Sequence, residues 1–158
     1  MEEKKYIYGL DLSMSCTGVS IFDKDGNIQF ICNIPTKDKD THGKRLKVIA
    51  DKFLELKEKY PPDKIIIERA FSRFNTATAV LYRVHGLVSY LFWDVEQIYY
   101  TPKTIKMNIL KGNATKKQIQ QTINSVYPNI VFNCEDESDS FSVGINYFIE
   151  HNILQWNR

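Results

Sequence analysis

The sequence lacks any apolar stretch near the roughly 20 residues that a membrane-spanning helix requires. Its first residues, Met-Glu-Glu-Lys-Lys, lack the apolar core of a signal peptide, so we expect a cytoplasmic protein. Cysteine is scarce: Cys16, Cys32 and Cys134 are odd in number and have no paired spacing. This pattern is typical of reduced thiols and disfavours a disulfide framework or a zinc site.

Acidic residues are absent from residues 97–134, although the whole chain carries 19 Asp and Glu against 21 Lys and Arg. The lysines of this stretch are Lys103, Lys106, Lys111, Lys116 and Lys117. The acids return at once in Glu135-Asp136-Glu137. A basic segment next to an acidic cluster favours a polyanion held beside metal ligands.

The chain is long enough for one domain with a sizeable core, and we expect a single domain over residues 1–158. Apolar periodicity and turn signals predict strands at 5–12, 16–23, 27–34, 64–68 and 95–100. They predict helices at 42–59, 75–93, 115–126 and 138–150, with a short helix starting at Pro102. Three strands followed by alternating helix and strand indicate an α/β fold, with a mixed five-stranded sheet flanked by helices.

The predicted helix at 75–93 has apolar residues around most of its circumference, whereas a surface helix normally carries one apolar stripe. One interpretation is a central helix buried on every side. The other is that one face packs on the sheet and the opposite face packs on a second copy of the chain, as in a two-fold dimer.

Two acids follow predicted strands directly. Asp11 ends the apolar run 6–10, and Glu68 ends the run 64–67. An Asp at a strand end often only starts a turn, and Glu68 could pair with Arg69 or a distant lysine. A carboxylate at the end of a buried strand is nevertheless costly unless a cation compensates it.

Asp136 and Asp139 are three residues apart at the start of the last predicted helix, so they share one helix face. Acids in a first helical turn can simply complement the helix dipole. Together with Asp11 and Glu68, however, they form a set of four carboxylates that can converge on one point. Such a set predicts a site for hard cations, and a pair of cations predicts phosphodiester chemistry.

Four segments resemble, in order and spacing, the motifs of the RuvC family of Holliday junction resolvases, which have an RNase H-like fold. The segments are Gly9-Leu10-Asp11 with Thr17-Gly18, then 67–71, then 106 with 112–120, and finally 136–141. The resemblance spans nearly the whole chain, which looks like a phage-encoded member. The chain departs from the family after Asp11, where Leu12-Ser13 replaces the usual Pro-Gly.

The resemblance implies a role for each matching residue. Asp11, Glu68, Asp136 and Asp139 match the family's metal-binding tetrad, and Lys106 and Lys116 match its two active-site lysines. Phe71 matches an aromatic residue that stacks on bases at the junction. Further DNA contacts are expected at Arg73, Phe74, Lys103, Lys111 and Lys117. Lys117 leaves open which of the two adjacent lysines contacts the scissile phosphate.

The activity that the resemblance implies is an endodeoxyribonuclease that uses two Mg²⁺ ions, with Mn²⁺ able to substitute. It would cut four-way junctions by paired symmetric nicks that leave 5′-phosphate and 3′-hydroxyl ends. Because one active site cuts one strand, paired cuts call for a homodimer on branched DNA. A carboxylate set without His or Cys agrees with Mg²⁺, which prefers oxygen ligands.

Three other functions are considered. A broader debranching nuclease would also act on forks, three-way junctions and flaps, and the sequence does not separate it from a strict resolvase. A phosphate-loop ATPase of the sugar-kinase or actin type is loosely mimicked by Asp11, Thr17, Gly18 and Asp23, but those proteins need two lobes and a far longer chain. A non-catalytic junction-binding module has no reason to hold four carboxylates beside a polyanion.

Overall fold

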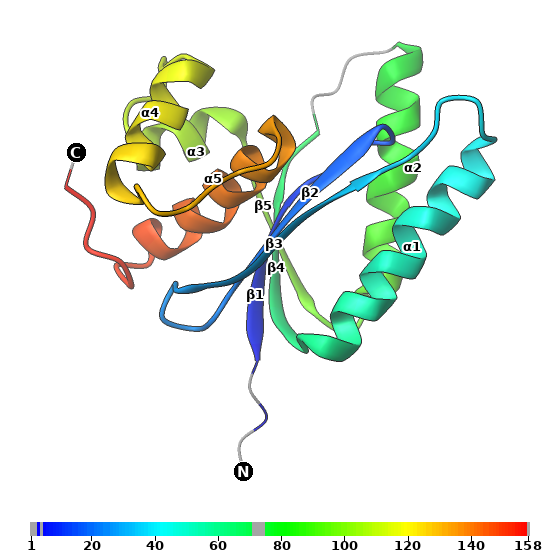
Figure 1. The fold of residues 1–158 in the computed structure, drawn as a ribbon, viewed down its shortest axis with the longest axis horizontal. Coiled ribbons are helices and arrows are strands. Elements are labelled where there is room, and N and C mark those ends of the chain that lie inside the picture. The colour runs from blue at the N-terminus through cyan, green and yellow to red at the C-terminus, as the bar shows by residue number, and fades with distance from the viewer. Residues whose placement is uncertain (1–2, 4, 71–74, 158) are drawn as a thin grey trace.

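The centre of the fold is a mixed sheet of five strands in the order β3-β2-β1-β4-β5 (Figure 1). The computed structural model describes residues 3, 5–70 and 75–157. The strands are β1 (Tyr6–Asp11), β2 (Cys16–Phe22), β3 (Ile28–Pro35), β4 (Pro62–Glu68) and β5 (Glu96–Tyr100). β1 is antiparallel to β2 and parallel to β4, and β4 is parallel to β5. The predicted α/β fold with a mixed five-stranded sheet is therefore confirmed.

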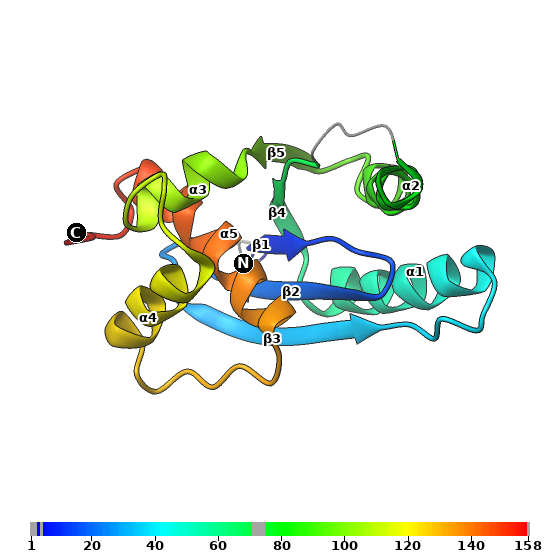
Figure 2. The same cartoon turned by 90° about the horizontal axis from the view of Figure 1, so that it is seen from above.

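Helices cover both faces of this sheet. The helices are α1 (His42–Lys59), α2 (Thr76–Leu91), α3 (Pro102–Ile109), α4 (Lys116–Val126) and α5 (Glu135–Glu150). α1 and α2 lie on one face, and α3, α4 and α5 lie on the other (Figures 1 and 2). Within the described part of the chain, no helix is both long enough and apolar enough to cross a membrane.

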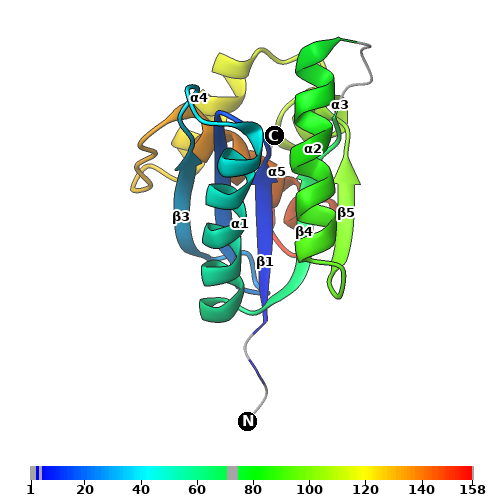
Figure 3. The same cartoon turned by 90° about the vertical axis from the view of Figure 1, so that its right-hand side faces the viewer.

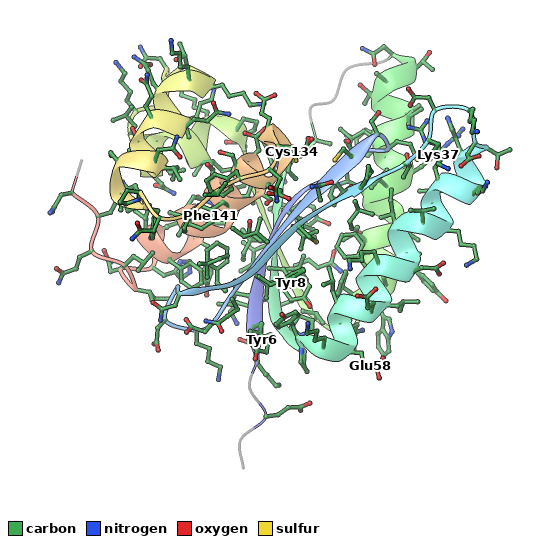
Figure 4. The ribbon with its side chains drawn as sticks, in the orientation of Figure 1. Tyr6, Tyr8, Lys37, Glu58, Cys134 and Phe141 are labelled. Atoms are coloured by element: carbon green, nitrogen blue, oxygen red, sulfur yellow. The ribbon has the colours of Figure 1, made fainter. Side chains whose placement is uncertain are left out.

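Each face of the sheet has its own apolar core, because the strands are apolar on both sides. Tyr8 and Phe53 belong to the core under α1 and α2, which Figure 3 views from the helix side. Ile66 and Phe141 belong to the core under α3, α4 and α5. Figure 4 shows Tyr8 and Phe141 on opposite sides of the sheet. The sheet is thereby fixed between two layers, and its strand ends become well-defined positions for functional groups.

α5 begins at Glu135, three residues before the predicted start, and this places Asp136 inside the helix. Glu135, Asp136 and Glu137 occupy the first turn, where negative charge is favourable beside the positive end of the helix dipole. The prediction began too late because Cys134, the residue before the helix, supplies no side-chain cap that would mark its start.

α2 is buried on one side only. Val84 and Val88 are buried against the sheet, whereas Tyr82 is 49%, Tyr90 75% and Trp93 79% exposed. The interpretation of a helix buried on every side is therefore wrong. Its apolar circumference divides into a face that packs on the core and a second face that carries exposed aromatic rings.

Three glycines let α5 approach β1 and β2 more closely than side chains would allow. A Cβ on Gly9 would lie 2.5 Å from the carbonyl oxygen of Ser140, and a Cβ on Gly18 would lie 1.9 Å from that of Asp136. In α5 itself, a Cβ on Gly144 would lie 2.2 Å from the ring of Phe22. Only glycine fits at such distances, so the start of α5 is held directly beside the ends of β1 and β2.

Candidate active site

Two of the predicted carboxylates lie at the carboxyl ends of neighbouring parallel strands. Asp11 is the last residue of β1, and Glu68 is the last residue of β4. Their strands pair in register, with Leu10 opposite Ile67, so both acids emerge at the same edge of the sheet. This edge, at the carboxyl ends of the strands, is where open α/β sheets usually bind ligands.

The turn after Asp11 is closed by hydroxyl groups instead of the Pro-Gly of the family pattern. The backbone amide of Cys16 donates to Oγ of Ser13 over 3.0 Å, and Oγ1 of Thr17 donates to the carbonyl of Ser13 over 2.8 Å. Leu12 is buried in the core beneath the turn. Asp11 still pairs with Gly18 in the β1–β2 ladder, so Leu12-Ser13 leaves the carboxylate on the strand end.

The other two carboxylates come from the first turn and a half of α5. The close approach at Gly18 holds the backbone of Asp136 against β2, and the next helical turn presents Asp139 toward β4. Buried Glu137 anchors this segment further, because its carboxylate accepts hydrogen bonds from Nδ2 of Asn33 and from the backbone amide of Asn133, each over 2.8 Å. The acidic helix start is thus tied to both β3 and the α4–α5 loop.

The two predicted active-site lysines lie across from these acids. Lys106 comes from α3, and Lys116 is the first residue of α4. Nζ of Lys116 lies 2.7 Å from Oδ2 of Asp139 and 2.8 Å from Oε1 of Glu135. The N-terminus of α4 is fixed by a capping box between Thr115 and Gln118, which sets the position of Lys116.

A cleft of about 240 Å³ runs between these groups. Its lining residues are Glu68, Pro102, Ile105, Lys106, Lys116, Ile119, Asp139, Ser142 and Val143. Two carboxylates and two ammonium groups therefore line the same cleft, together with apolar side chains. This arrangement suits a phosphate that is bound by cations on both sides.

The charges in this cluster strongly perturb Asp11. Burial, together with the charges of Asp139, Glu68 and Asp136, raises the pKa of Asp11 from 3.8 to about 8, against the opposing effect of Lys116. Burial and repulsion from the other three acids therefore act together on Asp11. A shift of this kind in a cleft marks a candidate functional site.

Glu68 and Asp139 are perturbed in the same direction. Burial and the charge of Asp139 raise the pKa of Glu68, while Lys116 and Lys106 oppose the shift. Burial also raises the pKa of Asp139, opposed by its hydrogen bond from Lys116. Among the described residues, Glu68 forms no direct ion pair with Arg69 or with a lysine, although the charges of Lys116 and Lys106 act on it.

The donor atoms fit hard divalent cations. Four carboxylates supply oxygen ligands, which Mg²⁺ and Mn²⁺ prefer, and their mutual repulsion would be relieved by positive charge. Within the described ranges, no three of these carboxylates bring oxygens within 4.8 Å of one another. Repulsion between the carboxylates keeps their oxygens apart, because among the described residues only Lys116 forms an ion pair with one of the four.

The predicted DNA contacts are placed in part. Lys103, Lys111 and Lys117 are exposed on α3, the following turn and α4, on the same side of the sheet as the cleft. Phe71, Arg73 and Phe74 lie outside the described residues. In the sequence they follow β4 closely, since residue 71 is three positions after Glu68.

Sequence reasoning missed two features of this site. Glu135 and Asp139 both form ion pairs with Lys116. The only sequence signal for the Glu135 pair was the place of Glu135 in the acidic run. Cys16 and Cys134 are free thiols, as predicted, yet they meet at Asp136. Burial and the Asp136 charge raise the pKa of the Cys16 thiol to about 12. Their separation along the chain hid this meeting from any spacing rule.

Comparison with known proteins identifies the family. The fold has the RNase H-like topology, and residues 7–147 match the family model of the crossover junction endodeoxyribonuclease RuvC. The chain is 34% identical over 124 residues to the Thermosipho melanesiensis enzyme of that name, covering 74% of this chain and 79% of the relative. It is 28% identical over 147 residues to the Wolbachia enzyme, covering 88% and 91%. The chain belongs to the RuvC family, whose members are metal-dependent nucleases.

Solved structures agree with the fold. T. thermophilus RuvC in complex with a Holliday junction substrate aligns with a TM-score of 0.81 at 12% identity, covering 94% of this chain and 96% of the other. The Fowlpox virus resolvase in complex with Holliday junction DNA aligns with a TM-score of 0.57 at 18% identity, covering 93% and 98%. The expected phage origin of the chain stays a prediction.

Proposed function

We propose that this protein is a structure-selective endodeoxyribonuclease that resolves Holliday junctions by paired symmetric nicks, leaving 5′-phosphate and 3′-hydroxyl ends. The observation that carries the proposal is the cleft between the carboxylates of Glu68 and Asp139 and the ammonium groups of Lys106 and Lys116, with Asp11 beside it. The relatives that share the family are named for this activity. We propose that residues 1–158 act as a single nuclease domain.

The carboxylate set would hold two Mg²⁺ ions, for which Mn²⁺ could substitute. Asp11 would be one of the ligands, because its charge is coupled to those of Asp139, Glu68 and Asp136. When bound, such ions lower the pKa of an attacking water and stabilise the charge on the leaving oxygen. Asp11 would lose its proton when the ions bind, since its raised pKa reflects burial and the uncompensated acids around it.

The lysines would then act on the DNA. Cations bound by the carboxylates would weaken the ion pairs of Lys116 with Asp139 and Glu135. The Lys116 ammonium would then be available to a phosphate in the cleft. Lys106, which lines the same cleft, would bind the same phosphate from α3. Both would stabilise the additional negative charge that the phosphate gains in the transition state.

Exposed lysines beyond the cleft would hold the arms of the junction. Lys103, Lys111 and Lys117 would bind backbone phosphates without regard to sequence, so affinity should fall steeply with added salt. Phe71, Arg73 and Phe74 follow the strand that carries Glu68, and we propose that they contact bases or phosphates near the branch point. The junction's shape would be the main feature recognised.

Two chains would act together through α2. Gly86 lies between the exposed rings of Tyr82 and Tyr90 at four-residue spacing, and exposed Trp93 extends the same stripe. A stripe of this composition is typical of an interface core. The occupant we propose is a second copy of the chain, because two symmetric cuts require two equivalent sites related by a two-fold axis.

The deciding experiment compares cleavage of four-way, three-way, flap and linear DNA by the purified protein with Mg²⁺. Symmetric paired nicks in the four-way junction, with 5′-phosphate ends, would support resolution. Equal cutting of the other branched substrates would favour the debranching nuclease, the second candidate. Absence of cutting in every substrate with Mg²⁺ or Mn²⁺ would overturn the proposal. We also propose that the protein acts in the cytoplasm, in agreement with its similarity to bacterial enzymes.

A further inference from the structure

Two thiols and one carboxylate meet where α5 begins, beside the proposed nuclease site. Sγ of Cys16, Sγ of Cys134 and a carboxylate oxygen of Asp136 all lie within 4.8 Å of one another. In the part of the chain that the structure describes, this is the one group of three or more potential metal-ligating side chains at such spacing. All three side chains are half-buried, so an ion can reach them. Figure 4 labels Cys134 at the start of α5.

The close packing of α5 on β2 creates this meeting. Cys16 opens β2 two residues before Gly18, and the absence of a side chain at Gly18 brings the backbone of Asp136 against the strand. Cys134 immediately precedes α5, two residues before Asp136. The three ligands therefore come from two rigid elements whose separation is fixed by backbone contact. A site built in this way needs no loop to close around an ion.

Ordinary structural roles account for Cys32 but not for the other two cysteines. Cys32 packs against the core under α1 and α2, whereas Cys16 and Cys134 belong to neither core cluster. Cys134 is the N-cap of α5, yet its side chain makes no capping hydrogen bond. Cys16 makes a long hydrogen bond of 3.9 Å to Oδ1 of Asn33, and its other polar neighbours are Asp136 and Cys134 themselves. Neither packing nor capping therefore explains why these two positions hold thiols.

We propose that Cys16, Cys134 and Asp136 form a site for one thiophilic divalent cation of the zinc class. Two thiolates and one carboxylate supply three ligands of a tetrahedral set, and water would take the fourth position. Each thiol releases its proton to solvent as its sulfur bonds the ion, with no change of oxidation state. Sulfur ligands select Zn²⁺ or Cd²⁺ over Mg²⁺, so this site differs in kind from the all-carboxylate set next to it.

Asp136 belongs to both the thiol site and the carboxylate set, so an ion at the thiol site would affect nuclease activity. Asp136 cannot hold a thiol-bound ion and serve the Mg²⁺ set at the same time with the same oxygen. Occupied by zinc, the thiol site would withdraw Asp136 and add positive charge beside Asp11, which would inhibit cleavage. This consequence rests on the proposed function, whereas the binding of the ion does not.

Binding is tested on the full, reduced chain by titrating Cd²⁺ and recording the ultraviolet charge-transfer absorption of cadmium–thiolate bonds. We expect saturation near one ion per chain for the wild type and for Cys32→Ser, the matched control. Cys16→Ser and Cys134→Ser should each weaken binding by at least about 10-fold. Asp136→Asn should keep the thiolate absorption but weaken affinity. Absence of the absorption in the wild type, or its persistence when Cys16 and Cys134 are both replaced, would overturn the site.

A second measurement needs no substitution, so it does not depend on a variant's folding. The wild type is alkylated with iodoacetamide, with and without Zn²⁺, and the modified cysteines are mapped by mass spectrometry. Zinc should slow alkylation of Cys16 and Cys134 and leave that of Cys32 unchanged. Equal protection of all three, or of none, would contradict the assignment.

The inhibitory consequence is tested separately by adding Zn²⁺ to junction cleavage in excess Mg²⁺. Inhibition of the wild type that is relieved in Cys16→Ser would support the sharing of Asp136. Cadmium binding at the thiols without inhibition by zinc would reject that sharing while leaving the site intact. A protein that binds cadmium but never cuts DNA would contradict the proposed function and not the thiol site.

Discussion

The ammonium of Lys116 lies 2.7 Å from a carboxylate oxygen of Asp139, across the mouth of the cleft. Burial acts against the charge of Lys116, but its hydrogen bonds to Asp139 and Glu135 outweigh burial and raise its pKa. The lysine thus neutralises part of the acidic set in the absence of other cations. The pairing connects the two halves of the proposed chemistry, because the same ammonium can serve the acids or the DNA.

Replacement of this lysine should slow the chemical step more than it weakens binding. In Lys116→Ala, we expect single-turnover cleavage of a four-way junction to fall by about 10²- to 10³-fold, the usual range for loss of one transition-state donor. Junction affinity in a gel-shift assay should change little. Lys117→Ala is the matched control. The Lys117 side chain is adjacent in sequence to Lys116, is exposed, and is absent from the cleft lining. A larger rate loss in Lys117→Ala would transfer the role to that residue.

The acid opposite Lys116 should be essential for cutting and dispensable for binding. Asp139→Asn removes a negative ligand but keeps nearly the same volume, so junction binding should persist. Cleavage with Mg²⁺ should fall to background. Fluorescence anisotropy and a nicking assay on the same preparation measure the two properties. Cleavage at the wild-type rate would show that Asp139 is not a metal ligand.

The raised pKa of Asp11 predicts a particular pH dependence of stability without metal. Its pKa is about 8 in the folded chain against an ordinary 3.8, so between these values the folded state binds a proton that the unfolded state does not. This contribution to stability is fully present below about pH 4 and is lost as pH rises through about 8. Melting temperatures in EDTA should therefore decline over this window.

Two controls isolate the effect at Asp11. Asp11→Asn cannot ionise, so it should flatten the decline and melt higher than the wild type near pH 8. Mg²⁺ should raise the wild-type melting temperature at pH 8 and have little effect at pH 5, because binding requires the ionised acid. Glu68 and Asp139 contribute in the same direction. A melting temperature that rises from pH 5 to 8 in EDTA would contradict the charge cluster.

Glycine at position 18 should be required for both stability and activity. In Gly18→Ala the added Cβ would lie 1.9 Å from the carbonyl oxygen of Asp136, so α5 must shift away from β2. We expect a loss of roughly 1–3 kcal/mol, as for other overpacked sites, and a larger proportional loss of cleavage. Gly43→Ala is the control, because nothing lies within 4 Å of its added Cβ. Equal melting temperatures for the two variants would argue against the close approach.

The exposed stripe on α2 should control assembly. Tyr90→Lys with Trp93→Lys places charge on the two most exposed rings of the stripe while leaving buried Val84 and Val88 in place. We expect light scattering to report monomers where the wild type forms dimers. Paired incision of a junction should become independent single nicks. Lys24→Glu, on the β2–β3 turn away from α2, supplies a charge-change control. Dimers that survive both substitutions would place the interface elsewhere.

Much of the fold could be predicted because local signals and tertiary packing agree. Asp25-Gly26 marks the β2–β3 turn, where Gly26 adopts a φ of 85°, and Thr41 caps α1 through the backbone amide of Lys44. The start of α5 was missed because Cys134 offers no capping signal there. The one-sided burial of α2 depends on which elements pack against it in the folded chain, which no local pattern encodes.

The candidate site was predictable as a set of positions but not as a network. Strand ends and helix spacing placed the four acids, and the family resemblance supplied their roles. The pairing of Lys116 with Asp139 required the relative positions of α4 and α5. The meeting of Cys16 and Cys134 required the glycine contact at Gly18, which is a property of packing and not of spacing.

The three glycine contacts between α5 and the sheet also bear on how this enzyme can change. Because Gly9, Gly18 and Gly144 each exclude even a methyl group, almost any substitution at these positions would be harmful. Variation that alters substrate preference must therefore accumulate elsewhere, and we propose the surfaces around the exposed Lys103, Lys111 and Lys117. An engineer seeking a resolvase with new branch selectivity should diversify those surfaces and leave the glycine contacts between α5 and the sheet unchanged.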